Sequence, residues 1–392
     1  MAAITKSVVL NAIDNVTFEE RPSAPPGPHE VHYIKHGRIG EFVVTGPMIL
    51  GHESAGDVVA VGSEVKSLKV GDRVALEPAG SYNQCRSLEF AATPPYNGTL
   101  CPTYNLHESF AHPIPPNMSF AAGALMEPLS VAVHCTVNRG KVRAMENVLV
   151  FGAGPIGLLS AAVAKAFGAK RVVVVDIIDS KLEFASSFAA THVFKPTKAN
   201  EGETSMQAAE RNAKALIEEI GDDVATVEGF DLVLECTGAP PCISMGLWAT
   251  KIQGRFVQVG MGQNDVTIPL HLVNIKELSV TGSFRYGFGA YPTAISLVAS
   301  GKIDVERLIT HRYRFEESLD AFEAVAEGKG KNGKSRFYGH SDQGEVVRSP
   351  AAPPTSPWAA FLAAAILFLL IGLAVMTLID DQSNEWAYAV AS

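Results

Sequence analysis

The sequence predicts an α/β fold in which a doubly wound parallel sheet is inserted between two parts of a β-rich domain. Between residues 147 and 260, short apolar runs alternate with helical patterns. Apolar runs of this kind are typical of parallel strands that helices cover on both faces. Before residue 130, short β runs alternate with turns that contain Pro and Gly, and that pattern returns after about residue 283.

The parallel part can be predicted element by element. Its first strand, 147–152, is a short β-branched run that ends in Gly, and Gly168 closes the helix pattern that follows. Further strands are expected at 171–176, 230–238 and 255–260, and helices at 180–190 and 203–220. In the β-rich part, the expected strands include 57–61 and 73–77.

The turn after the first strand matches the Rossmann fingerprint for binding a dinucleotide. Gly152 permits the tight turn, Gly154 lets the backbone approach a pyrophosphate, and Gly157 lets helix and strand pack closely. The following helix presents N–H groups and a partial positive charge to the phosphates. The alternative is a Gly-rich turn without a ligand. The predicted cofactor residues in this turn are Gly152, Gly154, Pro155, Ile156 and Gly157.

Asp176 ends the second strand, 19 residues after Gly157. An acid at this position can accept hydrogen bonds from both ribose hydroxyls and would repel a 2′-phosphate. Ile177 and Ile178 follow it and supply no Arg to replace it. We therefore expect NAD rather than NADP as the cofactor.

Composition excludes several other classes of protein. The chain has 392 residues, room for two or three domains, and its 47% apolar residues exclude a disordered chain. A net charge of −9 argues against a general nucleic-acid binder, which needs a basic face. Five Cys are too few for a disulfide scaffold and indicate a reducing compartment.

An apolar segment near the C-terminus predicts a transmembrane helix at residues 358–379. Its 22 residues carry no charge, and a helix of that length spans roughly 33 Å. The alternative is a buried core helix. Residues 346–357 are expected to form a linker. Lys and Arg precede the span, whereas Asp380, Asp381 and Glu385 follow it. This charge bias predicts a single-pass C-terminal anchor with the catalytic part in the cytoplasm and the short tail 380–392 across the membrane.

Five motifs occur in an order that resembles the zinc-dependent medium-chain dehydrogenases, specifically their polyol branch of sorbitol, xylitol and L-arabinitol dehydrogenases. The motifs are Gly51-His52-Glu53-Ser54-Ala55-Gly56, Val70-Gly71-Asp72-Arg73-Val74, Glu127-Pro128-Leu129-Ser130-Val131, the Gly152 turn and Gly282-Ser283-Phe284-Arg285-Tyr286. The resemblance implies a GroES-like catalytic domain at 1–134 that is shortened, an NAD-binding domain at 135–282, and a return to the catalytic domain at 283–345.

The resemblance also implies site residues and chemistry. His52, Glu53 and Glu127 match positions that hold a catalytic zinc ion. Tyr33, Arg285 and Tyr286 match residues that line the polyol pocket, and Arg285 also lies where the cofactor binds. The implied reaction is oxidation of a secondary hydroxyl of a sugar alcohol, with hydride transfer to NAD and a catalytic part played by His52, Glu53, Tyr33 and Glu127. The alternatives without a functional role are a surface His-Glu pair for His52 and Glu53, and a salt-bridged surface Arg for Arg285.

The chain departs from the family pattern in two places. No Cys precedes residue 85, so the Cys-Gly-Ser-Asp motif with its zinc-ligating Cys is absent. His29, His32 or His36 could substitute, although their spacing does not require it. Only Cys85 and Cys101 occur where the family carries a structural zinc lobe, so we expect at most one zinc ion. A second hypothesis is a non-catalytic, membrane-anchored NAD-binding protein, and a third is a zinc-free reductase. Family members commonly form homo-oligomers.

Overall fold

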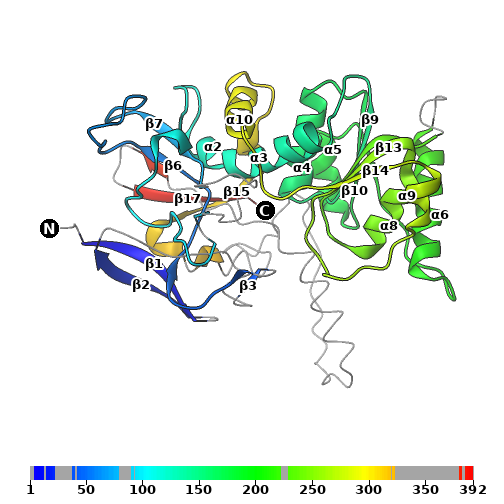
Figure 1. The fold of residues 1–392 in the computed structure, drawn as a ribbon, viewed down its shortest axis with the longest axis horizontal. Helices are drawn as coiled ribbons and strands as arrows, with labels where there is room; N and C mark the ends of the chain where they lie inside the picture. The colour runs from blue at the N-terminus through cyan, green and yellow to red at the C-terminus, as the bar shows by residue number, and fades with distance from the viewer. Residues whose placement is uncertain are drawn as a thin grey trace, which may run out of the picture.

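Figure 1 shows the computed structural model, which describes residues 4–12, 15–22, 38–39, 42–78, 90–91, 93–221, 228–318, 320–322, 379–381 and 385–391. A parallel sheet with its helices lies on one side of the molecule, and the β-rich part lies on the other. Helices α3 (Met126–Val133) and α10 (Ala290–Ala299) lie between the two parts and pack against each other.

The parallel sheet has six strands in the order β11-β10-β9-β12-β13-β14. The prediction of an α/β fold with a parallel sheet is therefore confirmed. The predicted strands occur, but β12 ends three residues before the expected 238 and β13 begins five residues before the expected 255. The bounds are β9 (Asn147–Phe151), β10 (Arg171–Val175), β11 (His192–Phe194), β12 (Phe230–Glu235), β13 (Thr250–Gln258) and β14 (Ser279–Gly282).

Successive residues of the central strands point to opposite faces, so each face has its own apolar core. Val148 and Val150 of β9 pack with α3, α4 (Pro155–Ala166) and α5 (Asp179–Phe188). Leu149 and Phe151 pack with α6 (Ser205–Ile220), α8 (Pro240–Ala249) and α9 (His271–Ile275). Both faces are covered, which explains why the strands read as continuous apolar runs.

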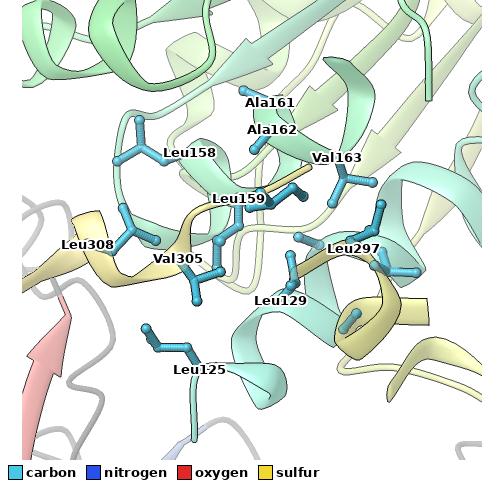
Figure 2. Close-up of a cluster of buried hydrophobic side chains, with 14 of the residues drawn as sticks. Leu125, Leu129, Leu158, Leu159, Ala161, Ala162, Val163, Leu297, Val305 and Leu308 are labelled. Atoms are coloured by element: carbon cyan, nitrogen blue, oxygen red, sulfur yellow. The ribbon is translucent and has the colours of Figure 1, made fainter. Parts of the chain in front are cut away.

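A shared apolar cluster joins the parallel sheet to the rest of the molecule. Figure 2 shows Leu129 of α3, Leu159 of α4 and Leu297 of α10 converging with Val305 and Leu308. The last two belong to a short 3-10 helix, η3 (Val305–Leu308). Because helices from both sides contribute, this cluster fixes the β-rich part relative to the carboxyl ends of the parallel strands.

The β-rich part contains small sheets in the orders β2-β1-β5, β6-β7-β8 and β3-β4. The predicted strand 73–77 is present, but the strand predicted at 57–61 ends at Asp57, and Val59 and Val61 are exposed. The elements are β1 (Ile4–Ala12), β2 (Asn15–Pro22), β3 (Arg38–Ile39), β4 (Phe42–Val43), β5 (Met48–Ile49), β6 (Ser54–Asp57), β7 (Arg73–Leu76), η1 (Glu108–Phe110), β8 (Ala111–Pro113), α2 (Phe120–Ala124) and a π-helix, η2 (His134–Arg139).

The C-terminal residues form an antiparallel sheet with the order β15-β17-β16. Its strands are β15 (Ile309–Arg314), β16 (Ile379–Asp381) and β17 (Glu385–Ala391), and a short helix, η4 (Phe315–Glu317), follows β15. Apart from Ile379, the predicted transmembrane segment lies outside the described residues, as does the predicted linker. In the part of the chain that is described, no helix is long and apolar enough to cross a membrane. A tail across a bilayer could not keep the observed pairing of β17 with β15.

Candidate active site: a dinucleotide cavity and a buried metal-ligand cluster

The glycine-rich turn joins β9 to α4 in a backbone conformation that requires glycine. Gly152 has a φ of +93°, a left-handed conformation that L side chains rarely adopt. A Cβ atom on Gly157 would lie 1.8 Å from the carbonyl oxygen of Gly152. No atom would lie within 4 Å of a Cβ on Gly154. Gly152 and Gly157 therefore allow the turn itself, whereas Gly154 leaves open space above it.

Helix α4 begins directly at this turn. Gly154 is its N-cap and Pro155 its first residue, where the fixed φ of Pro suits a helix start. The N–H groups of Ile156 and Gly157 lie in the first turn, where the helix itself supplies no acceptor. The end of α4 is therefore suited to bind an anionic group such as a pyrophosphate.

Asp176 follows β10 and is held by two backbone N–H groups. Its Oδ2 accepts a hydrogen bond from the N–H of Ala153 at 2.8 Å, and its Oδ1 accepts one from Ile178 at 3.0 Å. The first of these bonds ties the carboxylate to the glycine-rich turn. Asp176 is thus fixed beside the turn.

A cavity of about 700 Å³ opens beside this turn. Gly152, Asp176, Thr237, Gly238 and Gly262 are among its lining residues. These five residues follow strands of the parallel sheet at its carboxyl edge, where doubly wound folds bind ligands, and residues of α6 and α8 complete the lining. The volume is within the range of cofactor pockets.

A second site lies in the β-rich part, where three buried side chains converge. His52 and Glu53 directly precede β6, and Glu127 lies in the first turn of α3. Their exposed fractions are 9%, 2% and 2%. One ligand atom from each lies within 4.8 Å of the others, and Nε2 of His52 is 4.0 Å from Oε1 of Glu53.

The donor set of this cluster fits a metal ion. An imidazole nitrogen and carboxylate oxygens are donors that zinc accepts in proteins. Two carboxylates buried beside each other repel, and a cation among them offsets both that repulsion and the cost of burial. The structure therefore brings together the three predicted ligands, and they could hold one divalent cation.

Aromatic rings and a guanidinium group adjoin the cluster. The ring of Phe90 lies 5.7 Å from that of His52 and 6.1 Å from that of Tyr286. The guanidinium carbon of Arg285 lies 3.6 Å from the centre of the Phe90 ring, and Arg285 donates a hydrogen bond to Oγ1 of Thr93. The cluster is thus bordered by an apolar wall that also carries a cation and a hydroxyl.

Negative charges lie near the tyrosines of this wall. Burial raises the pKa of Tyr286 well above its ordinary value, and the negative charges of Glu127 and Glu77 add to the effect. Burial also raises the pKa of Tyr291, whose ring lies 5.4 Å from that of Tyr286. Both phenols therefore remain neutral at physiological pH and can donate hydrogen bonds.

The predicted site residues form two groups. Gly152 and Asp176 line the cavity, and the other turn residues, Gly154, Pro155, Ile156 and Gly157, are not among its lining residues. His52, Glu53, Glu127 and Tyr286 lie in or near the cluster. Arg285 packs on Phe90 and is not among the residues that line the cavity, so its predicted contact with the cofactor stays a prediction. Tyr33 and the alternative ligands His29, His32 and His36 lie outside the described residues.

Several residues of both sites were not predicted from the sequence. Phe90 and Thr93 lie next to the cluster, but their residue types alone do not indicate chemistry. Glu77 is buried and its Oε2 lies 2.6 Å from Nε2 of His112, a pair that 35 residues separate in the sequence. Glu235 is buried at the end of β12, and its place at a strand end was the signal that could have found it.

Comparison with known proteins identifies relatives of both parts. Residues 155–300 match the model for zinc-binding dehydrogenases, and residues 27–116 match the alcohol dehydrogenase GroES-like domain. D-xylulose reductase A from Aspergillus niger is 45% identical over 350 residues, which cover 83% of this chain and 94% of that protein. A probable D-xylulose reductase A from Aspergillus clavatus is 46% identical with the same coverage.

Solved structures show the same fold. L-idonate 5-dehydrogenase from Escherichia coli has a TM-score of 0.72 at 26% identity and covers 84% of this chain and 97% of its own. Galactitol-1-phosphate dehydrogenase from Escherichia coli has a TM-score of 0.68 at 26% identity, covering 82% and 96%. A protein named as a putative zinc-binding dehydrogenase, from Sinorhizobium meliloti and bound to NADP, matches with a TM-score of 0.68 at 26% identity, covering 82% and 95%.

Proposed function

Because the chain belongs to the zinc-binding dehydrogenase family, we propose that it is an NAD-dependent polyol dehydrogenase that oxidises a secondary hydroxyl of a sugar alcohol to a ketose. The observation that carries the proposal is the 45% identity to D-xylulose reductase A over most of both chains. Reduction of the keto group of D-xylulose and oxidation of the corresponding alcohol, xylitol, are the two directions of one reaction. The buried ligand cluster supports the same conclusion.

His52, Glu53 and Glu127 would hold a zinc ion, which polarises the substrate hydroxyl and makes it more acidic. Phe90 and Tyr286 exclude water from the cluster side. Arg285 and Thr93 offer a donor group and a hydroxyl that can bind further hydroxyls of a polyol. A bound NAD would accept the hydride of the carbinol carbon at C4 of its nicotinamide, and the hydroxyl proton would be released to solvent.

NAD is the proposed cofactor because Asp176 lies at the cavity with its carboxylate held in place. It can accept hydrogen bonds from the ribose hydroxyls and would repel a 2′-phosphate. Lys198 also lines the cavity and could attract that phosphate. The ratio of the affinities for NAD and NADP therefore tests this assignment, and we expect NAD to bind more tightly.

The absent Cys-Gly-Ser-Asp motif implies that zinc is bound through nitrogen and oxygen atoms only. Thiolate is a softer ligand that zinc binds strongly, so this site should hold zinc more weakly than a site with Cys. We propose one zinc ion per chain and a catalytic domain that is shortened at its N-terminal part. The same absence favours the second candidate, a non-catalytic NAD-binding protein.

We propose further that residues 358–379 form a single-pass C-terminal anchor, with the catalytic part on the cytoplasmic side. The length and the lack of charge of this segment support the proposal. In that state the tail would leave β15, so protease protection of residues 380–392 in sealed vesicles tests it. Protection by the bilayer supports the anchor, and cleavage from the catalytic side contradicts it.

A homo-oligomer is also proposed. Strand β14 is the last strand of the described parallel sheet on its side, and Val280 on it is 48% exposed. An exposed edge strand is a surface on which a second copy can pair. Light scattering of the purified chain tests the proposal, and a mass of one chain at micromolar concentration would contradict it.

The experiment that tests the proposed activity uses the full chain with zinc content measured beside turnover. We expect NAD-linked oxidation of xylitol, with sorbitol and arabinitol as comparison substrates, and loss of the activity in His52→Ala. Binding of NADH without oxidation of any of the three polyols would instead support the non-catalytic candidate.

A further inference from the structure

Glu235 is a fully buried carboxylate at the carboxyl edge of the parallel sheet. It is the last residue of β12 and lies in register with Phe151 of β9 and Gln258 of β13. These three strands therefore end at the same level. The loops that follow them supply Gly152, Thr237, Gly238 and Gly262 to the dinucleotide cavity.

These loops pack against one another with little space. A Cβ atom on Gly262 would lie 2.1 Å from the carbonyl oxygen of Gly238, and one on Gly152 would lie 2.9 Å from Cγ2 of Thr237. The N–H groups of Val259 and Gly260 both bond to the carbonyl oxygen of Glu235 at 2.8 Å. Glu235 thus lies directly beneath the loops that line the cavity.

Four donors surround the carboxylate of Glu235, and all of them are neutral. Its Oε1 accepts hydrogen bonds from the N–H of Thr237 at 2.9 Å and from the hydroxyl of the same residue. Its Oε2 accepts from the N–H of Gly238 at 2.8 Å and from Nε2 of Gln258 at 2.7 Å. Three of these donors are N–H groups that cannot accept a hydrogen bond, and only the Thr237 hydroxyl could face a protonated oxygen, so the arrangement fits the ionised form.

The charge of Glu235 acts on the cavity. Burial raises the pKa of Glu235, and its four donors oppose that shift. Burial, followed by the charges of Glu235 and Asp176, raises the pKa of the Cys242 thiol to about 12, and Cys242 lines the cavity. No cation lies within hydrogen-bond distance of Glu235 in the described part of the chain.

The two redox states of the cofactor differ in charge. In doubly wound folds, the half built on β9 and β10 binds one nucleotide, and the half built on β12 and β13 binds the other. Asp176 assigns the first half to the adenosine, which leaves the second half, where Glu235 lies, to the nicotinamide. The oxidised nicotinamide carries a positive charge, whereas the reduced ring is neutral.

We propose that Glu235 is a positioning residue that holds the loops after β12 and β13 in place, and that its buried negative charge makes the site prefer the oxidised over the reduced cofactor. The inference rests on the proposed function, because it requires that the cavity binds NAD.

The first test compares Glu235→Gln with Glu235→Asp in the full chain. Dissociation constants for NAD⁺ and NADH are measured by calorimetry and by NADH fluorescence, without substrate. In Glu235→Gln we expect the ratio of the constant for NAD⁺ to that for NADH to rise roughly tenfold, as for loss of one unit charge that acts over about 10 Å at an effective dielectric constant near 20. Glu235→Asp keeps the charge but shortens the side chain that positions the loops. We therefore expect the affinities for NAD⁺ and NADH to fall by the same factor, so that their ratio is unchanged.

A second pair of variants keeps Glu235 and changes its neighbour. Gln258→Lys places an ammonium group beside the carboxylate and compensates its charge, so we expect the ratio to rise as in Glu235→Gln. Gln258→Leu removes the same amide without adding charge and should leave the ratio unchanged. This pair keeps the proposal testable if Glu235→Gln fails to fold.

The possible results distinguish failure of the inference about Glu235 from failure of the proposed cofactor. A ratio that stays constant in Glu235→Gln and Gln258→Lys, while both affinities weaken, would show a purely structural role and overturn the inference alone. A wild-type chain that binds neither NAD⁺ nor NADH would overturn the proposed cofactor and the inference together.

Discussion

At the scale of single residues, the carboxylate of Asp176 has a structural role and a proposed role in binding. It accepts a hydrogen bond from Ala153 and so fixes the glycine-rich turn, and it lines the cavity where a ribose would lie. Its position two residues before Ile178 lets its other oxygen bond to that N–H, which holds the carboxylate in one orientation.

Asp176→Ala should weaken NADH binding at least about tenfold, because hydrogen bonds to a charged acceptor contribute roughly 1.5–3 kcal/mol each. NADH fluorescence titration measures the loss. Asp231→Ala is the matched control, since Asp231 accepts from the N–H of Asn147 at the opposite edge of the sheet. Equal NADH affinity in Asp176→Ala and the wild type would contradict the cofactor assignment.

His52→Ala should reduce the zinc content from one ion per chain to near zero, because it removes the only nitrogen donor of the described cluster. Elemental analysis after dialysis measures this. His112→Ala is the control: its ring bonds to Glu77, and neither residue belongs to the cluster, so its zinc content should equal that of the wild type. Two zinc ions per wild-type chain would be evidence for a second site.

The sequence indicates candidate site residues where a local motif carries them. The turn 152–157, Asp176 and the pair His52-Glu53 could all be named as candidates, since backbone conformation and ligand chemistry constrain the residue type at each position. Phe90 and Thr93 could not be assigned a role, and Glu235 could be noted only as an acid at the end of a strand. Their importance arises from contacts with residues far along the chain, such as Arg285 and Gln258, and no local pattern records such contacts.

At the scale of elements, the β9–turn–α4 unit combines a packing requirement with a binding requirement. Gly157 is needed because the helix and the turn approach closely, whereas Gly154 borders open space. Substitutions at the two positions should therefore separate folding from binding.

Gly157→Ala should lower the free energy of unfolding by about 3 kcal/mol or more, because its Cβ would collide with the carbonyl oxygen of Gly152. Gly154→Ala should leave the Tm nearly unchanged and yet abolish most NADH binding, since its methyl group would occupy the space of the pyrophosphate. Thermal unfolding and fluorescence titration measure both. A large loss of stability in Gly154→Ala would contradict this division.

The elements that the sequence does not reveal are those without a clear periodic pattern. Helix α8 begins with two Pro residues and then packs between β12, β13 and α6, so it lacks a polar face that would mark it as amphipathic. The first residues of β13, Thr250–Gly254, include an exposed Ile252 and a left-handed Gln253, which hide the start of the strand.

At the scale of the whole molecule, the two sites belong to different parts that one apolar cluster holds together. Leu129 of α3 lies in that apolar cluster, two residues after Glu127, the candidate metal ligand. Helix α3 therefore connects the buried cluster of His52, Glu53 and Glu127 with the packing around α4, which carries the glycine-rich turn. The pairing of β15 with β17, which are more than 70 residues apart, could not be predicted, because no local pattern specifies so distant a partner.

Deletion of residues 358–378 should move the protein from the membrane pellet to the supernatant after alkaline extraction, if these residues anchor it as proposed. The deleted segment supplies nearly all of the uncharged apolar run, so little affinity for a bilayer would remain. NADH binding should be unchanged and serves as the control for folding. A deletion variant that stays in the pellet would contradict the anchor.

The most direct test of the account is a crystal structure of the full chain with NADH and zinc, with anomalous data collected at the zinc edge. We expect one anomalous peak among His52, Glu53 and Glu127, and NADH in the cavity with its adenosine ribose bonded to Asp176. A peak elsewhere, or a dinucleotide that does not contact Asp176 and the glycine-rich turn, would contradict the assignment of both sites.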